Sequence, residues 1–82
     1  MTYTIYIDDA KITNVSTREY AIQLIDFYAN LICNNYNQSC CNINKTIYKK
    51  YINETTIHII TEYNMLFKTY LKVKRKIYFS KN

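Results

Sequence analysis

Charged or aromatic side chains alternate with mostly apolar ones, almost without error, from residue 67 to residue 79. A period of two is typical of a half-buried β-strand, because successive side chains point to opposite faces of a sheet. The odd positions are predicted to enter a core: Phe67, Thr69, Leu71, Val73, Ile77 and Phe79. Arg75 is the one exception in that set. The even positions are predicted to share one solvent-facing ladder: Lys68, Tyr70, Lys72, Lys74, Lys76 and Tyr78.

This Lys/Tyr ladder predicts a binding face and names no reaction. Ammonium groups interleaved with flat rings suit a polyanion with stackable bases, and they also suit an acidic protein surface. We add Arg75, Lys49 and Lys50 to the candidate binding residues, because they extend the same basic region. Lysines along a strand also protect a sheet edge against aggregation, so a solvated edge is the alternative interpretation.

The net charge of +5 is concentrated in the C-terminal half of the 82-residue chain. Residues 1–41 hold two basic and four acidic side chains, a balance of −2, whereas residues 42–82 hold nine and two, a balance of +7. A basic half of this kind favours an anionic partner. The length predicts a single domain over residues 1–82 with one modest core.

The chain contains no glycine, which excludes several standard sites. Phosphate-binding loops, the dinucleotide fingerprint and the nucleophile elbow all need glycine for positive φ or for close backbone approach. Turns are expected to use Asn and Asp, and few tight hairpins are expected. Ile, Asn, Lys, Tyr and Phe fill 45 positions, a bias typical of A+T-rich genomes such as those of low-GC bacteria and their phages.

The N-terminal half predicts a hairpin followed by a helix. Residues 2–7 form the first strand, with Tyr3, Ile5 and Ile7 on one face, and Asp8-Asp9 turns it into a second strand over 11–15. Ser16 and Glu19 have capping-box spacing. The apolar positions that follow keep a helical period to about residue 35.

The C-terminal half predicts a connection, a short helix and two strands. Residues 36–44 lack any period, and Asn44 then caps a helix over 45–52. Residues 55–63 are predicted to form a strand that turns at Asn64 into the ladder. A long C-terminal helix is the alternative, because apolar residues from Ile60 onward also fit spacings of three and four. The expected fold is α+β, a small antiparallel sheet of order ββα(α)ββ with one main helix packed on one face.

Candidate catalytic and metal-binding residues are sparse. Cys33, Cys40 and Cys41 lack a second pair at zinc-site spacing, so we expect reduced thiols, with Cys33 at the helix edge, and no metal. His58 has no nucleophile or orienting partner nearby in the sequence. Asp8-Asp9 beside Lys11 is better explained as a turn than as a nuclease centre. We therefore expect no catalytic residue and no cofactor.

No export signal or membrane span is visible in the sequence, so we expect a protein of the cytosol that does not bind membranes. The N-terminal strand–turn–strand–helix pattern of residues 3–35, the small size and the A+T-rich composition resemble the small accessory proteins of phages and mobile elements. Anti-CRISPR proteins are the best-known group among these. The resemblance rests on general character over the whole chain and carries no residue role.

The resemblance implies an inhibitor that acts without chemistry, by binding a host RNA-guided nuclease complex and occupying the place of its guide or target. Many such inhibitors are acidic mimics of nucleic acid, whereas this chain is basic in its C-terminal half. We therefore expect contact with guide RNA or with an acidic protein surface. A free-standing RNA- or DNA-binding module is the second hypothesis, and an antitoxin-like or oligomeric structural protein is the third.

Overall fold

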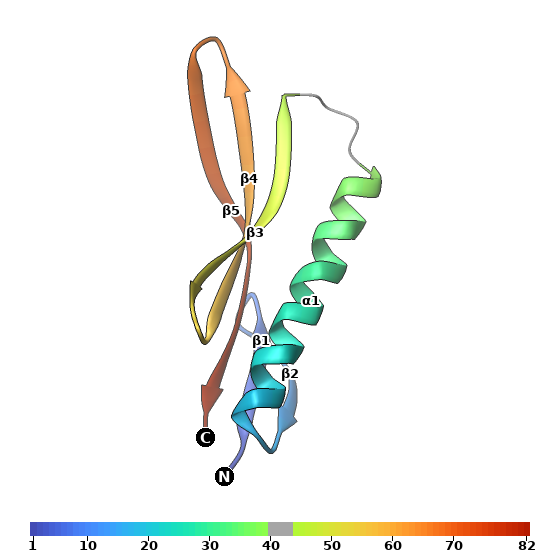
Figure 1. The fold of residues 1–82 in the computed structure, drawn as a ribbon, viewed down its shortest axis with the longest axis vertical. Coiled ribbons are helices and arrows are strands. Elements are labelled where there is room, and N and C mark those ends of the chain that lie inside the picture. Colours follow the sequence, from blue (N-terminus) through green and yellow to red (C-terminus); the bar gives the residue numbers. More distant parts are fainter. Residues whose placement is uncertain (40–43) are drawn as a thin grey trace.

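The computed structural model describes residues 1–39 and 44–82, and in this part of the chain one helix lies across one face of a five-stranded antiparallel sheet (Figure 1). The elements in chain order are β1 (Tyr3–Ile7), β2 (Ala10–Val15), α1 (Arg18–Ser39), β3 (Lys45–Asn53), β4 (Thr56–Met65) and β5 (Lys68–Lys81). The strand order is β2-β1-β5-β4-β3, so β5 pairs with both the N-terminal hairpin and β4. The α+β prediction with one main helix on one face is confirmed.

Helix α1 begins one residue later than the capping box predicted. The side-chain oxygen of Thr17 accepts a hydrogen bond from the Tyr20 amide at 3.2 Å, and its carbonyl accepts one from the Ala21 amide at 3.1 Å. These bonds identify Thr17 as the N-cap, since a cap side chain normally satisfies the third amide of the helix. The helix then continues to Ser39, past the predicted end near residue 35.

The core lies between α1 and the middle of the sheet. Buried side chains recur every four residues on the inner face of α1, namely Ala21, Ile25, Ala29 and Cys33. Three of the four are small, which allows the helix to approach the sheet closely, and all four pack on a set of buried strand residues: Ile5, Ile47, Ile57, Ile59, Ile77 and Phe79. Tyr3 and Ile7 pack beside Ile5, as the sequence predicted.

The prediction of a short helix over residues 45–52 is wrong, because this segment forms β3 and the element order is ββαβββ. In the strand, Ile47 enters the core opposite Thr61, and Lys49 on the same face reaches Asp26 of α1. Residues 56–65 and 68–81 are strands, so the alternative of a long C-terminal helix is also wrong.

Tight hairpins are more frequent than the glycine-free sequence predicted. Two-residue connections join β1 to β2, β3 to β4, and β4 to β5. Asp8 and Asp9 both have positive φ, as do Leu66 and Phe67. Paired positive φ values are typical of the type I′ hairpin turn, which matches the twist of the strands. Asp tolerates positive φ better than Leu or Phe does, so the β4–β5 turn at Leu66 and Phe67 is strained.

The β4–β5 hairpin projects beyond the rest of the protein (Figure 1). The molecule measures 50 × 22 × 19 Å, and this hairpin forms one end of its long axis. Leu66 and Phe67 at the tip are almost fully exposed. The projecting half of the sheet therefore offers surfaces that the core does not use.

Candidate functional site

Strand β5 carries one more residue than β4 in the middle of their pairing. Ile59 lies opposite Arg75, whereas the next residue, Ile60, lies opposite Val73, so Lys74 is the extra residue of a β-bulge. One inserted residue exchanges the two faces of a strand from that point onward. Arg75 and Ile77, which follow the bulge in the chain, therefore lie on the side of the sheet that faces α1. In the part of β5 that precedes the bulge, residues 68–73, the even-numbered positions face α1 instead.

The bulge divides the predicted ladder into two groups on opposite faces. Lys68, Tyr70 and Lys72 lie opposite Met65, Tyr63 and Thr61 of β4. Thr61 in turn lies opposite the core residue Ile47. Lys68, Tyr70 and Lys72 therefore lie on the same face of the sheet as the core residues that α1 covers. The prediction that all six even positions share one face is thus wrong.

The odd positions beyond the bulge are not buried. Leu71 is 59% exposed and Val73 is 50% exposed, and both lie on the face away from α1. Only Ile77 and Phe79 of the predicted odd set belong to the core. The prediction of a continuous apolar face fails because the bulge places Leu71 and Val73 on the face that α1 does not cover.

Lys76 and Tyr78 are held on the face away from α1. The Tyr78 ring stacks on Tyr6 with 4.9 Å between ring centres, and the Lys76 ammonium lies 4.8 Å from the centre of the Tyr78 ring. The Tyr78 hydroxyl donates a hydrogen bond of 2.6 Å to Asp9, which raises the pKa of Tyr78 to about 12. This pair is therefore built into the N-terminal hairpin and lies apart from Lys68 and Lys72.

Arg75 joins three elements. Its guanidinium donates to the Tyr36 hydroxyl at 3.1 Å and to the Asp8 carboxylate at 2.5 Å. The bond to Tyr36 and the bond to Asp8 raise the pKa of Arg75 above its usual value. Partial burial alone would raise the pKa of Asp8, but hydrogen bonds from the Lys76 amide and from Arg75 hold it below its usual value. The charge of Arg75 is thus used to connect β5 with α1 and the β1–β2 turn, and it is less available to a binding partner.

Two further lysines lie over tyrosine rings on the α1 side. The Lys74 ammonium lies 4.8 Å from the centre of the Tyr36 ring, and the Lys45 ammonium lies 5.5 Å from the centre of the Tyr63 ring. Cation–π contacts of this kind restrict where a long side chain can place its charge. No pattern in the sequence indicated Lys45, Tyr63 or Tyr36 as site residues, because only the pairing of β3 with β4 and the length of α1 bring them to this face.

We name this surface the distal lysine face, defined by four lysines and two tyrosines: Lys45, Tyr63, Lys68, Tyr70, Lys72 and Lys74. None of its four lysines has a carboxylate partner within the described residues, where the ion pairs are Arg18–Glu54, Lys49–Asp26 and Arg75–Asp8. The face therefore carries four uncompensated positive charges. Tyr70 presents its ring to solvent, being 51% exposed.

A small polar hollow of about 200 Å³ opens on this face. Its lining residues are Thr61, Tyr63, Lys72, Val73 and Lys74. Thr61 is only 1% exposed, and its hydroxyl has no hydrogen-bond partner among residues 1–39 and 44–82. Buried hydroxyls without a partner are uncommon, because each costs free energy. A bound group that accepts a hydrogen bond beside Lys72 and Lys74 would satisfy it.

The other two predicted basic residues do not belong to the distal lysine face. Lys49 makes an ion pair of 2.7 Å with Asp26, which also accepts a hydrogen bond from the Tyr51 hydroxyl. The bond to Asp26 raises the pKa of Lys49, and the bonds from Lys49 and Tyr51 lower the pKa of Asp26. Lys50 is exposed opposite His58, on the face away from α1.

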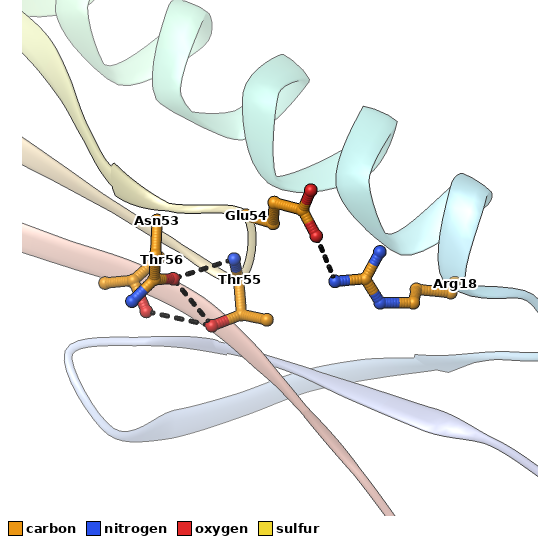
Figure 2. A network of polar contacts seen from close by, with 5 residues as sticks. All are labelled: Arg18, Asn53, Glu54, Thr55 and Thr56. Carbon is orange, nitrogen blue, oxygen red and sulfur yellow. Dashed lines mark hydrogen bonds and ion pairs between the residues drawn. The ribbon is translucent and has the colours of Figure 1, made fainter.

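At the end of β3 away from the distal lysine face, the carboxylate of Glu54 makes an ion pair with Arg18 of α1. Figure 2 shows Glu54 in the β3–β4 turn accepting a hydrogen bond of 2.6 Å from Arg18 at the start of α1. Beside it, the Asn53 side chain accepts bonds of 2.8 Å from both the amide and the hydroxyl of Thr55. The first contact connects the turn to the helix, and the Asn53 bonds hold the turn itself.

A larger hollow of about 620 Å³ lies between α1 and the β3–β4 turn, with apolar walls that include Ile22, Ile25 and Ile57. Its two carboxylates, Asp26 and Glu54, are already in ion pairs. This hollow therefore offers a ligand fewer unpaired charged side chains than the distal lysine face does.

Metal-binding geometry is absent from the part of the chain that the structure describes: no three His, Cys, Asp or Glu side chains are grouped there. Cys33 is buried in the core, where desolvation raises the pKa of its thiol, and does not lie at a helix edge as predicted. Cys40 and Cys41 lie outside the described residues. His58 lies on the face away from α1, opposite Lys50 and Lys76.

Comparisons of the chain with protein-family models, with curated proteins and with solved structures found no match. Within residues 1–39 and 44–82, no helix has the length and apolar character needed to cross a lipid bilayer.

Proposed function

We propose that the protein is a non-enzymatic binding protein that holds single-stranded RNA on the distal lysine face. The observation that carries this proposal is the set of four lysines without carboxylate partners, two of which line the hollow of an unsatisfied buried hydroxyl. Their attraction to phosphates would supply most of the affinity, as it does in sequence-independent nucleic-acid binding.

The spacing of the face suits a linear polyanion. Lys68, Tyr70 and Lys72 follow one another at every second position of β5, so their Cα atoms are about 6.6 Å apart. The lysines would contact successive phosphates, and the exposed ring of Tyr70 would stack on a base. The contacts of Lys74 with Tyr36 and of Lys45 with Tyr63 hold two of the charges in place, which lowers the entropy lost on binding.

The polar hollow supports a phosphate contact in particular. The Thr61 hydroxyl can donate a hydrogen bond to a phosphate oxygen, and Lys72 and Lys74 on the same hollow would balance its charge. An acidic protein side chain would satisfy only part of this arrangement, because Lys68 of β5 and Lys45 of β3 lie outside the hollow.

The biological role that we propose is inhibition of a host RNA-guided nuclease, with its guide as the bound RNA. This role follows from the resemblance to anti-CRISPR proteins together with the basic surface. A free-standing RNA-binding module would use the same face. The two roles therefore differ in which RNA is bound, and not in the protein residues that contact it.

The test compares two charge reversals that change the net charge equally. We expect Lys72→Glu to weaken binding of a fluorescently labelled single-stranded RNA by about tenfold or more, because one phosphate contact is lost and a repulsion added. Lys76→Glu lies on the opposite face and should change the affinity by less than about twofold. Equal loss in both variants, or no binding by the wild type, would contradict the proposal.

A second assay addresses the role. Wild-type protein should inhibit target cleavage by a nuclease loaded with its guide RNA, and Lys72→Glu should not. RNA binding without inhibition would favour the free-standing module.

A further inference from the structure

Helix α1 has a second apolar stripe on its outer face. Tyr20, Leu24, Phe27 and Leu31 follow one another at spacings of four, three and four residues. Tyr20 and Phe27 are each 54% exposed and Leu31 is 45% exposed. A 4-3-4 spacing is the seam by which two helices pack in a coiled coil. Leu24 lies at the border of this seam and packs partly against the core cluster, whereas Tyr20, Phe27 and Leu31 are exposed and are not among the described residues that pack on that cluster.

The seam contains a ready-made hole for a side chain of another helix. A hollow of about 410 Å³ is lined by Tyr20, Gln23, Leu24 and Phe27. These are positions i, i+3, i+4 and i+7, the four residues that form the hole in knobs-into-holes packing. The shape of the surface therefore fits a helix better than it fits a strand or an extended peptide.

The uncharged seam permits a second copy of this helix as the occupant. The helix carries three charged residues, Arg18, Glu19 and Asp26, and none of them belongs to the seam. Arg18 and Asp26 are already in ion pairs with β3 and its turn. Two copies can thus bring their seams together without burying a charge, even though each chain carries a net charge of +5.

We propose that two copies of the chain associate through this seam with their α1 helices antiparallel. With the twofold axis at the level of Ile25 and Asp26, Phe27 of each copy enters the hollow of the other, and Tyr20 lies against Leu31. A parallel pair would place two distal lysine faces side by side at the C-terminal ends of the helices, where their charges repel. The antiparallel pair places them at opposite ends.

The dimer is expected to be weak. A fully buried aromatic side chain covers roughly 150–250 Å², so the half-exposed Tyr20 and Phe27 would each add about 100 Å² per copy. With Leu24 and Leu31 the total stays below the roughly 1,200 Å² typical of stable complexes. Association is therefore expected only at high micromolar protein concentration.

Sedimentation equilibrium over a range of about 5 to 500 µM tests this proposal. The weight-average mass of the wild type should rise from 9.9 kDa toward twice that value. Phe27→Glu should remain monomeric at every concentration, because its carboxylate would enter the apolar hollow. Asn37→Glu adds the same charge to α1 at an exposed position outside the seam and should dimerise like the wild type. A monomeric wild type, or equal loss in both variants, would overturn the proposal.

A mixing experiment tests the antiparallel arrangement. Tyr20→Glu and Leu31→Lys should each be monomeric alone, and an equimolar mixture should recover heterodimers, because these positions face each other across the twofold axis. Circular dichroism would establish that both variants keep the helix. In a parallel pair the two positions are about 16 Å apart along the helix axis, so a mixture that stays monomeric while the wild type dimerises would overturn this arrangement.

Discussion

The ammonium group of Lys74 lies 4.8 Å from the centre of the Tyr36 ring, which joins the bulge of β5 to the end of α1. The next residue, Arg75, donates a hydrogen bond to the hydroxyl of the same tyrosine. Neighbouring residues of β5 thus hold one side chain of the helix, at the point where the strand exchanges its faces. The exchange is what gathers the distal lysine face on the α1 side.

The two sides of the bulge should differ in their contribution to stability. Ile77→Ala should lower the free energy of unfolding by about 2 to 5 kcal/mol, because Ile77 is fully buried in the core. Val73→Ala should cost less than about 1 kcal/mol, because Val73 is half exposed on the uncovered face. Urea unfolding of both variants measures the difference. A larger loss for Val73→Ala would contradict the assigned register.

The turn between β4 and β5 should be improvable. Leu66 and Phe67 both have positive φ, a region that disfavours side chains of their size. Replacing them by Asn and Gly, the preferred pair for a type I′ turn, should stabilise the protein by about 1 kcal/mol. Thermal unfolding of the double variant measures this gain. A lower melting temperature would mean that the turn has another conformation or that its apolar residues make unseen contacts.

Acid should weaken the contact between α1 and β3. Hydrogen bonds from Lys49 and Tyr51 lower the pKa of Asp26, so the charged form is favoured in the folded protein. The resulting stabilisation is present above the unfolded pKa of about 3.9 and is lost as the pH falls through the folded value. Asp26→Asn should therefore destabilise the protein at pH 6 and much less at pH 2.

Chemical unfolding of wild type and variant across this pH range measures the effect. Glu19→Gln is a suitable control, because it removes a carboxylate of α1 that has no ion pair among the described residues. A difference between wild type and Asp26→Asn that does not change with pH would argue against the Asp26 interaction.

Local patterns predicted the elements that depend on short-range chemistry. The β1–β2 hairpin followed from apolar alternation around Asp8-Asp9, and α1 followed from a long helical period. Residues 45–53 were misassigned because their lysines and apolar residues also fit a helical period, and only pairing with β4 makes them a strand. Tertiary pairing overrides local preference in such segments.

The candidate site could be predicted only in part. The alternation of residues 67–79 gave Lys68, Tyr70, Lys72 and Lys74, but it also implied that Lys76 and Tyr78 share their face. A bulge depends on the partner strand, so the alternation along one strand does not locate it. The one visible signal was Arg75, the charged exception among the odd positions, which lies next to the bulge and bonds to Tyr36 and Asp8.

The salt dependence of RNA affinity tests the central claim most directly. Four phosphate contacts, through Lys45, Lys68, Lys72 and Lys74, predict a slope of log affinity against log salt of about −2.8, from about −0.7 per contact for single strands. Lys72→Ala should reduce the slope to about −2.1, and Lys76→Ala should leave it unchanged. An equal change in both variants, or a wild-type slope near zero, would contradict binding through the distal lysine face.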